Sequence, residues 1–147
     1  MDFTKTVTKV NWVKVAITVL VVGVSGWILT WLVTKGIRFV RDKIREGKVI
    51  DQANNEIKDG DVTLTPSAIH NLADRIYSAV LGPGTDEEAI YSAFRQLRTR
   101  SDLMSLIRVF GIRKRKTLSE WLTEDLSQAE IEKLNAILVT NKINYSF

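Results

Sequence analysis

Apolar residues are distributed unevenly along the chain, and one run of them stands apart. Residues 15–34 read VAITVLVVGVSGWILTWLVT, a stretch without a charge that is bounded by Lys14 and Lys35. At about 1.5 Å per helical residue this run spans roughly 30 Å, the thickness of the hydrocarbon core of a bilayer. The rest of the chain is too short to bury such a helix on all sides, and a cleaved signal peptide has a shorter apolar region. The pattern therefore predicts a single transmembrane helix.

The residues beside this run are typical of a membrane interface. Trp12 and Trp31 lie near its two ends, where an indole ring sits at the headgroup level with its N–H in water. Three basic residues precede the run and six follow it up to residue 48. The positive-inside rule thus places the C-terminal part on the cytoplasmic side, or on the side derived from it. The predicted membrane anchors are Trp12, Lys14, Trp31, Lys35, Arg38 and Arg41.

Composition changes again after the run. The predicted helix and its basic juxtamembrane extension cover residues 1–46, and residues 47–64 are polar and predict a linker or a weak helix. Residues 1–60 carry 10 Lys+Arg and 6 Asp+Glu, a net charge of +4, whereas residues 61–147 carry 11 of each. The excess positive charge therefore belongs to the predicted membrane-flanking half, which argues against nucleic acid as a specific partner.

Helical periodicity begins after the linker, in a predicted domain over residues 65–139. Five short helices are expected there, and each begins at a side chain that can cap a helix: Thr65, Thr85, Ser101, Thr117 and Ser127. Glu88 lies three residues after Thr85 and completes a predicted capping box. Glycines at 82 and 111 end two of the helices. The expected fold class is all-α: one N-terminal transmembrane helix with a basic stalk, then a five-helix bundle.

The predicted helical domain resembles a known repeat. LGPGTDEEAIYSAFRQLRTRSDL (residues 81–103), TLSEWLTEDLS (117–127) and IEKLNAIL (131–138) resemble a single annexin repeat, in which a G-x-G-T-[DE] loop joins the first two of five helices. Annexins have four repeats and no transmembrane anchor, whereas this chain has one repeat and a predicted anchor, so it looks like an annexin-like module. Lone modules of this kind resemble membrane-associated virion proteins of bacteriophages with Bacteroidetes-type hosts.

The resemblance implies one candidate cofactor, calcium. Its ligands would be the backbone carbonyls of Leu81, Gly82 and Gly84, with the carboxylate of Asp125 or Glu124. The chain departs from the annexin pattern in having aspartate at the carboxylate position, a proline inside the loop and glutamine where the family has glycine. The same loop also fits a helix-to-helix turn followed by a capped helix, and the sequence leaves both interpretations open.

Other chemistry is restricted by composition. The chain has no cysteine and one histidine, His70, which excludes disulfides, thiolate metal sites and multi-histidine metal sites. No carboxylate pair has the setting of an acid/base pair, so we predict no catalytic residue and no enzyme. The basic run at residues 113–116 fits either contact with phosphate groups or a solvated loop.

The last residues, 140–147, form a predicted C-terminal tail. Ile143, Tyr145 and Phe147 alternate with polar residues, so the tail fits either docking on its own helices or addition to a partner. The small residues Gly26 and Thr30 in the predicted span have the spacing that lets helices approach closely, and they favour association between copies of the chain.

Together these features predict a structural single-pass membrane protein of a membrane-containing bacteriophage virion. It would link the lipid bilayer to the capsid or to neighbouring copies, with its C-terminal domain on the cytoplasm-derived side of the internal membrane. The alternative is a calcium-dependent phospholipid-binding module in a cellular membrane. A third class, an accessory anchor for a cell-wall enzyme or a secretion machine, also fits the sequence.

Overall fold

The computed structural model describes residues 41, 43–58 and 60–147, and every contact discussed below lies within the unit formed by residues 42–147. The predicted span at 15–34 lies outside the described residues. So do five of the predicted anchors, Trp12, Lys14, Trp31, Lys35 and Arg38. Arg41 is described, with a helical backbone and an exposed side chain. Among the described helices, none combines the length and the apolar character that a membrane crossing requires.

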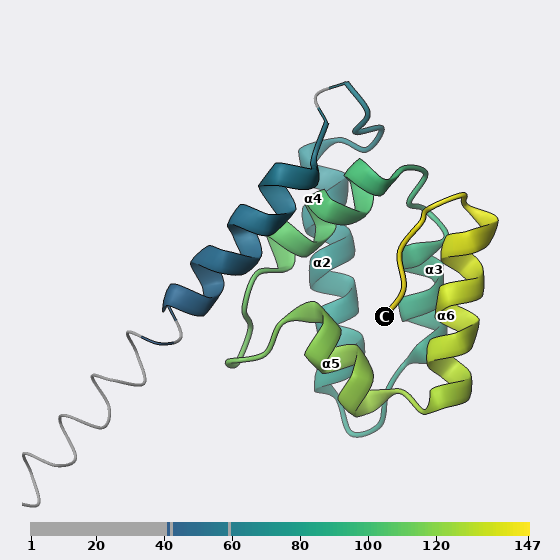
Figure 1. The fold of residues 1–147 in the computed structure, drawn as a ribbon. Coiled ribbons are helices and arrows are strands. Elements are labelled where there is room, and N and C mark those ends of the chain that lie inside the picture. Colours follow the sequence, from purple (N-terminus) through teal and green to yellow (C-terminus); the bar gives the residue numbers. More distant parts are fainter. Residues whose placement is uncertain (1–40, 42, 59) are drawn as a thin grey trace, which may run out of the picture. The chain divides into compact units, whose positions relative to one another are not determined.

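Six helices make up the described part of the chain, which confirms an all-α fold there (Figure 1). The first covers residues 43–56. The others are α2 (Pro66–Leu81), α3 (Glu87–Phe94), α4 (Arg100–Phe110), α5 (Leu118–Asp125) and α6 (Gln128–Thr140). Helix α2 contacts α3, α4 and α5, and α3 in turn packs on α6. The α2 helix therefore runs through the middle of the domain.

The core lies between these helices and follows the predicted apolar spacing. Each helix from α2 to α6 contributes side chains that are fully or almost fully buried, because its apolar residues recur every three to four positions on one face. The largest of them are Ile76, Ile90, Phe94, Leu103, Leu106, Leu118, Leu122, Leu134 and Leu138, and Leu97, between α3 and α4, is fully buried beside them. Burial of this apolar face supplies most of the stability of helices that are only 8 to 16 residues long.

Three of the five predicted helix starts are confirmed and two are shifted. Thr65, Thr117 and Ser127 are the N-cap residues of α2, α5 and α6. Helix α3 is capped by Asp86, whose side chain accepts a hydrogen bond from the Ala89 N–H, and the expected cap one residue earlier is wrong. Helix α4 is capped by Thr99, which forms a capping box with Asp102, and the expected cap at residue 101 is wrong. In both cases a neighbouring side chain is better placed for the first free amides.

The polar segment at residues 47–64 was expected to be a linker or a weak helix, and its first part is a helix. It is helical through residue 56, and Ala53 is only 2% exposed. Ile57 packs against the core, and Glu56 forms an ion pair with Arg100. Val49 lies four residues before Ala53, so the segment is an amphipathic helix whose exposed face accounts for its polar composition. The helix and the turn after it are thus part of the helical domain.

Candidate functional site

The loop between α2 and α3 carries the carbonyls that the resemblance assigns to calcium. Leu81 ends α2 with its side chain exposed, and Gly82 continues in an extended conformation. Gly84 has a φ of +93°, a conformation that glycine adopts without steric cost. The Thr85 hydroxyl donates a hydrogen bond to the carbonyl oxygen of Asp125 at 3.4 Å. This contact brings the loop next to the end of α5, forty residues further along the chain.

The two candidate carboxylates have different surroundings. Glu124 forms an ion pair with Lys116, so its carboxylate already has a cationic partner. Asp125 is half-buried, and its Oδ2 atom is buried without a hydrogen-bond partner among the described residues. No cluster of three or more Asp, Glu or His side chains able to hold a metal occurs in the described part of the chain. Asp125 and the loop carbonyls would therefore fill only part of the oxygen shell that calcium requires.

A second polar centre, at Asp102, was not predicted from the sequence. Its carboxylate is fully buried and accepts five hydrogen bonds at 2.7 to 3.2 Å. The donors are the Thr63 N–H and hydroxyl and the N–H groups of Leu64, Arg98 and Thr99. Burial alone would raise the pKa of Asp102, but these hydrogen bonds hold it below its usual value. The centre ties the segment before α2 to the start of α4.

A tight hairpin at residues 113–116 joins α4 to α5. Arg113 and Lys116 exchange two backbone hydrogen bonds at 2.9 and 3.1 Å. The two residues between them, Lys114 and Arg115, have φ values of +47° and +71°. Positive φ at both central residues defines a type I′ turn, which favours Asn-Gly, and a side chain there costs about 1–2 kcal/mol per residue. This turn therefore carries two cationic side chains in a conformation that disfavours them.

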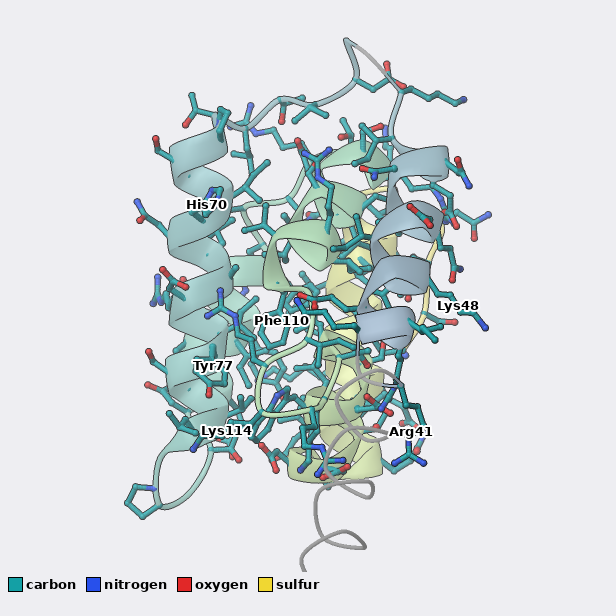
Figure 2. The ribbon with its side chains drawn as sticks, turned by 90° about the vertical axis from the view of Figure 1, so that its left-hand side faces the viewer. Arg41, Lys48, His70, Tyr77, Phe110 and Lys114 are labelled. Carbon is teal, nitrogen blue, oxygen red and sulfur yellow. The ribbon has the colours of Figure 1, made fainter. Side chains whose placement is uncertain are left out.

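The ends of this hairpin are held by cation–aromatic contacts. The Arg113 guanidinium lies 5.0 Å from the ring centroids of both Tyr77 and Phe110, and it forms an ion pair with Asp74 at 2.8 Å. The Trp121 indole donates a hydrogen bond to the Arg113 carbonyl at 3.0 Å. Figure 2 labels Tyr77, Phe110 and Lys114, and the rings of Tyr77 and Phe110 lie edge to face with centroids 6.1 Å apart. These contacts over-determine the hairpin and so maintain its strained turn.

The hairpin also contacts the first helix of the domain. Arg45 donates a hydrogen bond to the carbonyl oxygen of Arg115 at 3.3 Å and forms an ion pair with Glu120. Burial raises the pKa of Glu120, but the Thr117 amide and Arg45 outweigh this effect and lower it. Glu120 also completes the capping box of α5. The loop that follows α4 thus reaches the start of the helix at residues 43–56 (Figure 1).

The C-terminal tail docks on its own domain, which is one of the two arrangements that its pattern allows. Ile143 is only 1% exposed, and Phe147 packs edge-on against Phe94 with ring centroids 5.5 Å apart. The Asn135 side chain accepts a hydrogen bond from the Phe147 N–H at 2.9 Å and donates one to the Phe147 carbonyl at 3.3 Å. Tyr145 lies half-buried, next to the Phe147 ring. These side chains therefore cover the core in the structure.

His70, the remaining residue singled out above, is exposed on α2, and its Nδ1 lies 2.8 Å from the carbonyl of Pro66. His70 is therefore a histidine on the surface of a helix.

Comparison of the chain with protein-family models, with curated proteins and with solved structures finds no match.

Proposed function

We propose that the chain is a structural single-pass membrane protein, which holds a compact helical domain at a bilayer surface. The observation that carries the proposal is the short stretch of sequence between the uncharged run and the first helix of the domain. The uncharged run ends at residue 34, and the first helix of the domain begins by residue 43. Nine chain steps extend at most about 30 Å, so a membrane-inserted run would keep the domain within that distance of its exit point.

The contacts of the first helix support a scaffold role. Glu56 pairs with Arg100, Asn54 accepts a hydrogen bond from Arg108, and Arg45 reaches both Glu120 and the hairpin. The segment after the predicted anchor is thereby fixed to the domain at several points. A force applied to the domain would be transmitted to the predicted membrane helix, as a link between a bilayer and a protein shell requires.

The setting that we propose is the internal membrane of a bacteriophage virion, with the domain facing the capsid or neighbouring copies on the cytoplasm-derived side. Its support is the resemblance of the GPGTDE loop and the helices around it to lone annexin-like modules. The test is proteomics of gradient-purified particles released by the producing cells, before and after detergent treatment. We expect the protein in intact particles and its loss with the lipid fraction. Particles that lack it, while the cell envelope contains it, would contradict the virion setting.

A calcium-dependent phospholipid-binding module is the second candidate, and one observation favours it. The buried Oδ2 atom of Asp125 lacks a hydrogen-bond partner among the described residues and lies on the residue whose carbonyl contacts Thr85. Calcium titration of the full chain, with Asp125→Asn as the comparison and Glu124→Gln as the control, tests this candidate. Heat release that only Asp125→Asn abolishes would support it, and no heat from the unaltered chain would refute it.

A further inference from the structure

A cationic surface lies at the end of the domain where α3 and α6 both terminate. Two open hollows, of about 430 and 340 Å³, share Arg95 and Arg98 as lining residues. Lys142 lines the smaller of the two. None of the described residues that line either hollow is acidic. A group that enters the hollows would therefore meet three cations and no carboxylate in their described lining.

The backbone that carries these cations is held from two sides. The Asn141 side chain donates hydrogen bonds to the carbonyls of Phe94 and Leu97, at 3.1 and 2.8 Å, and so fastens the end of α6 to the loop between α3 and α4. On the other side of that loop, the Arg98 N–H donates to the buried carboxylate of Asp102 at 3.0 Å. The hollows are therefore formed before any ligand arrives, which lowers the entropic cost of binding.

Two of the three cations occupy positions that the backbone does not favour. Helix α6 ends in a Schellman motif with two backbone hydrogen bonds of 2.9 Å, and Lys142, at a φ of +59°, takes the place where glycine is preferred. Arg98 lies just before α4, at a helix start that favours negative charge. Arg95 differs, because it follows the end of α3 and pairs with Glu88 at 2.5 Å. Helix stability thus accounts for Arg95 better than for the other two.

The hollows lie at the end of the domain away from the point where the chain enters it. The first helix begins near the hairpin, since Arg45 donates a hydrogen bond to the carbonyl of Arg115. Figure 1 shows the ends of α3 and α6 on the opposite side of the domain from the start of that helix. The location favours a ligand that reaches the domain from the side away from the predicted anchor, as a protein shell would.

The lining favours an acidic protein segment as the ligand. Arginine donates paired hydrogen bonds to carboxylates, and Leu64, which is half-buried in the larger hollow, offers apolar contact to the neighbouring side chains of a peptide. No aromatic side chain is among the described residues of the lining, so the hollows lack the stacking surface typical of single-stranded nucleic acid sites.

We propose that Arg95, Arg98 and Lys142 bind a carboxylate-rich segment of a partner protein, and that this contact fastens the domain to the protein shell. The proposal rests on the scaffold role proposed above and names the chemistry of its partner. A pair between an exposed cation and a carboxylate contributes about two- to fivefold to binding. Removal of two of the cations should therefore weaken binding by about 4- to 25-fold.

The experiment measures binding of a fluorescent glutamate-rich peptide to the full chain in non-ionic detergent micelles, by fluorescence anisotropy. A peptide of the same length with glutamine in place of every glutamate shows whether the carboxylates are needed. Each titration is repeated at about 50 mM and about 500 mM salt, because salt screens contacts between exposed charges.

Two variants of the hollows separate charge from folding. Arg98→Gln with Lys142→Gly removes two cations and relieves the positive φ, so this variant is expected to unfold at a higher urea concentration than Arg98→Gln with Lys142→Gln. The second variant removes the same charges without that relief. The matched control is Lys48→Gln with Arg75→Gln, which removes two exposed cations that line neither hollow.

We expect the glutamate-rich peptide to bind, the glutamine peptide not to bind, and high salt to weaken binding. Both hollow variants should lose about 4- to 25-fold in affinity, and the control should keep the affinity of the unaltered chain. Absence of binding to the unaltered chain would overturn the proposal, as would an equal loss in the control. Tighter binding of double-stranded DNA or of anionic vesicles that the hollow variants abolish would also overturn it, and would assign the cations to phosphate groups.

This assay and the test of the anchor fail separately, because binding in micelles does not depend on insertion into a bilayer. A chain that alkaline carbonate extracts from membranes, but that binds the peptide through the hollows, refutes the anchor and supports the peptide contact. A chain that resists extraction and does not bind the peptide refutes the peptide contact alone.

Discussion

Asp102 offers the sharpest test of how the domain is held together. Asp102→Ala removes a fully buried carboxylate that accepts five hydrogen bonds. At about 1 kcal/mol for each bond the loss is about 5 kcal/mol. Thr63 and Arg98 are exposed residues, so water can replace part of their bonding and the expected loss is about 3–5 kcal/mol. This is a large fraction of the stability of a small domain.

The measurement is urea unfolding of the full chain in detergent micelles, followed by far-ultraviolet circular dichroism. Asp51→Ala is the matched control, because Asp51 is an exposed aspartate on the first helix, and its loss is expected to change the free energy of unfolding by less than about 0.5 kcal/mol. Asp102→Ala and Asp51→Ala variants of equal stability would refute the assigned role of the buried carboxylate.

The pH dependence of stability follows from the same group. The pKa of Asp102 is lowered in the folded state, so its contribution is present above the pKa of the unfolded chain, about 3.9. That contribution is lost as pH falls through the lower folded-state value. We expect the free energy of unfolding to fall below about pH 5 less steeply for Asp102→Asn than for the unaltered chain. Parallel pH profiles for the two proteins would contradict the assignment.

Three further changes test other parts of the fold by the same unfolding assay. Gly111→Ala places a side chain at a φ of +57° and should cost about 1–3 kcal/mol, whereas Gly47→Ala, inside a helix, should stabilise by about 0.5–1 kcal/mol. Ile143→Ala should cost about 2–4 kcal/mol, against almost nothing for Val139→Ala, which is 71% exposed; equal losses would argue that the tail is not docked. Trp121→Phe should cost about 1 kcal/mol through the lost hydrogen bond to the hairpin, and an unchanged midpoint would remove that contact from the account.

Local signals predicted the helices well, because a helix start depends on side chains within three or four residues. Thr65, Thr117 and Ser127 illustrate this. Where two neighbouring residues can both cap a helix, a distant contact decides between them. Thr85 bonds the carbonyl of Asp125, and Asp86 caps α3 in its place. The sequence spacing alone holds no information on that contact.

The packing of the first helix on the domain and the Asp102 centre were not predicted, for different reasons. Apolar residues are sparse in the first helix, so its polar face dominates the composition, although Val49, Ala53 and Ile57 repeat every four residues. Asp102 was recognisable as part of a helix start. Its bonds to the segment before α2 were not, since Thr63 lies 39 residues away in the sequence. Sequence spacing can predict that a carboxylate caps a helix, but it does not predict which distant amide groups also donate hydrogen bonds to that carboxylate.

Insertion of residues 15–34 into a bilayer is the central claim, and alkaline carbonate extraction of membranes that contain the full chain tests it most directly. The comparison is between the unaltered chain, Val21→Arg with Val22→Arg at the middle of the run, and Ser67→Arg with Asn71→Arg on the exposed face of α2. Each arginine at the centre of a span opposes insertion by about 2.5–3.5 kcal/mol. The account predicts that the unaltered chain and the α2 variant stay in the membrane pellet and that the run variant is extracted. Extraction of all three proteins would contradict it.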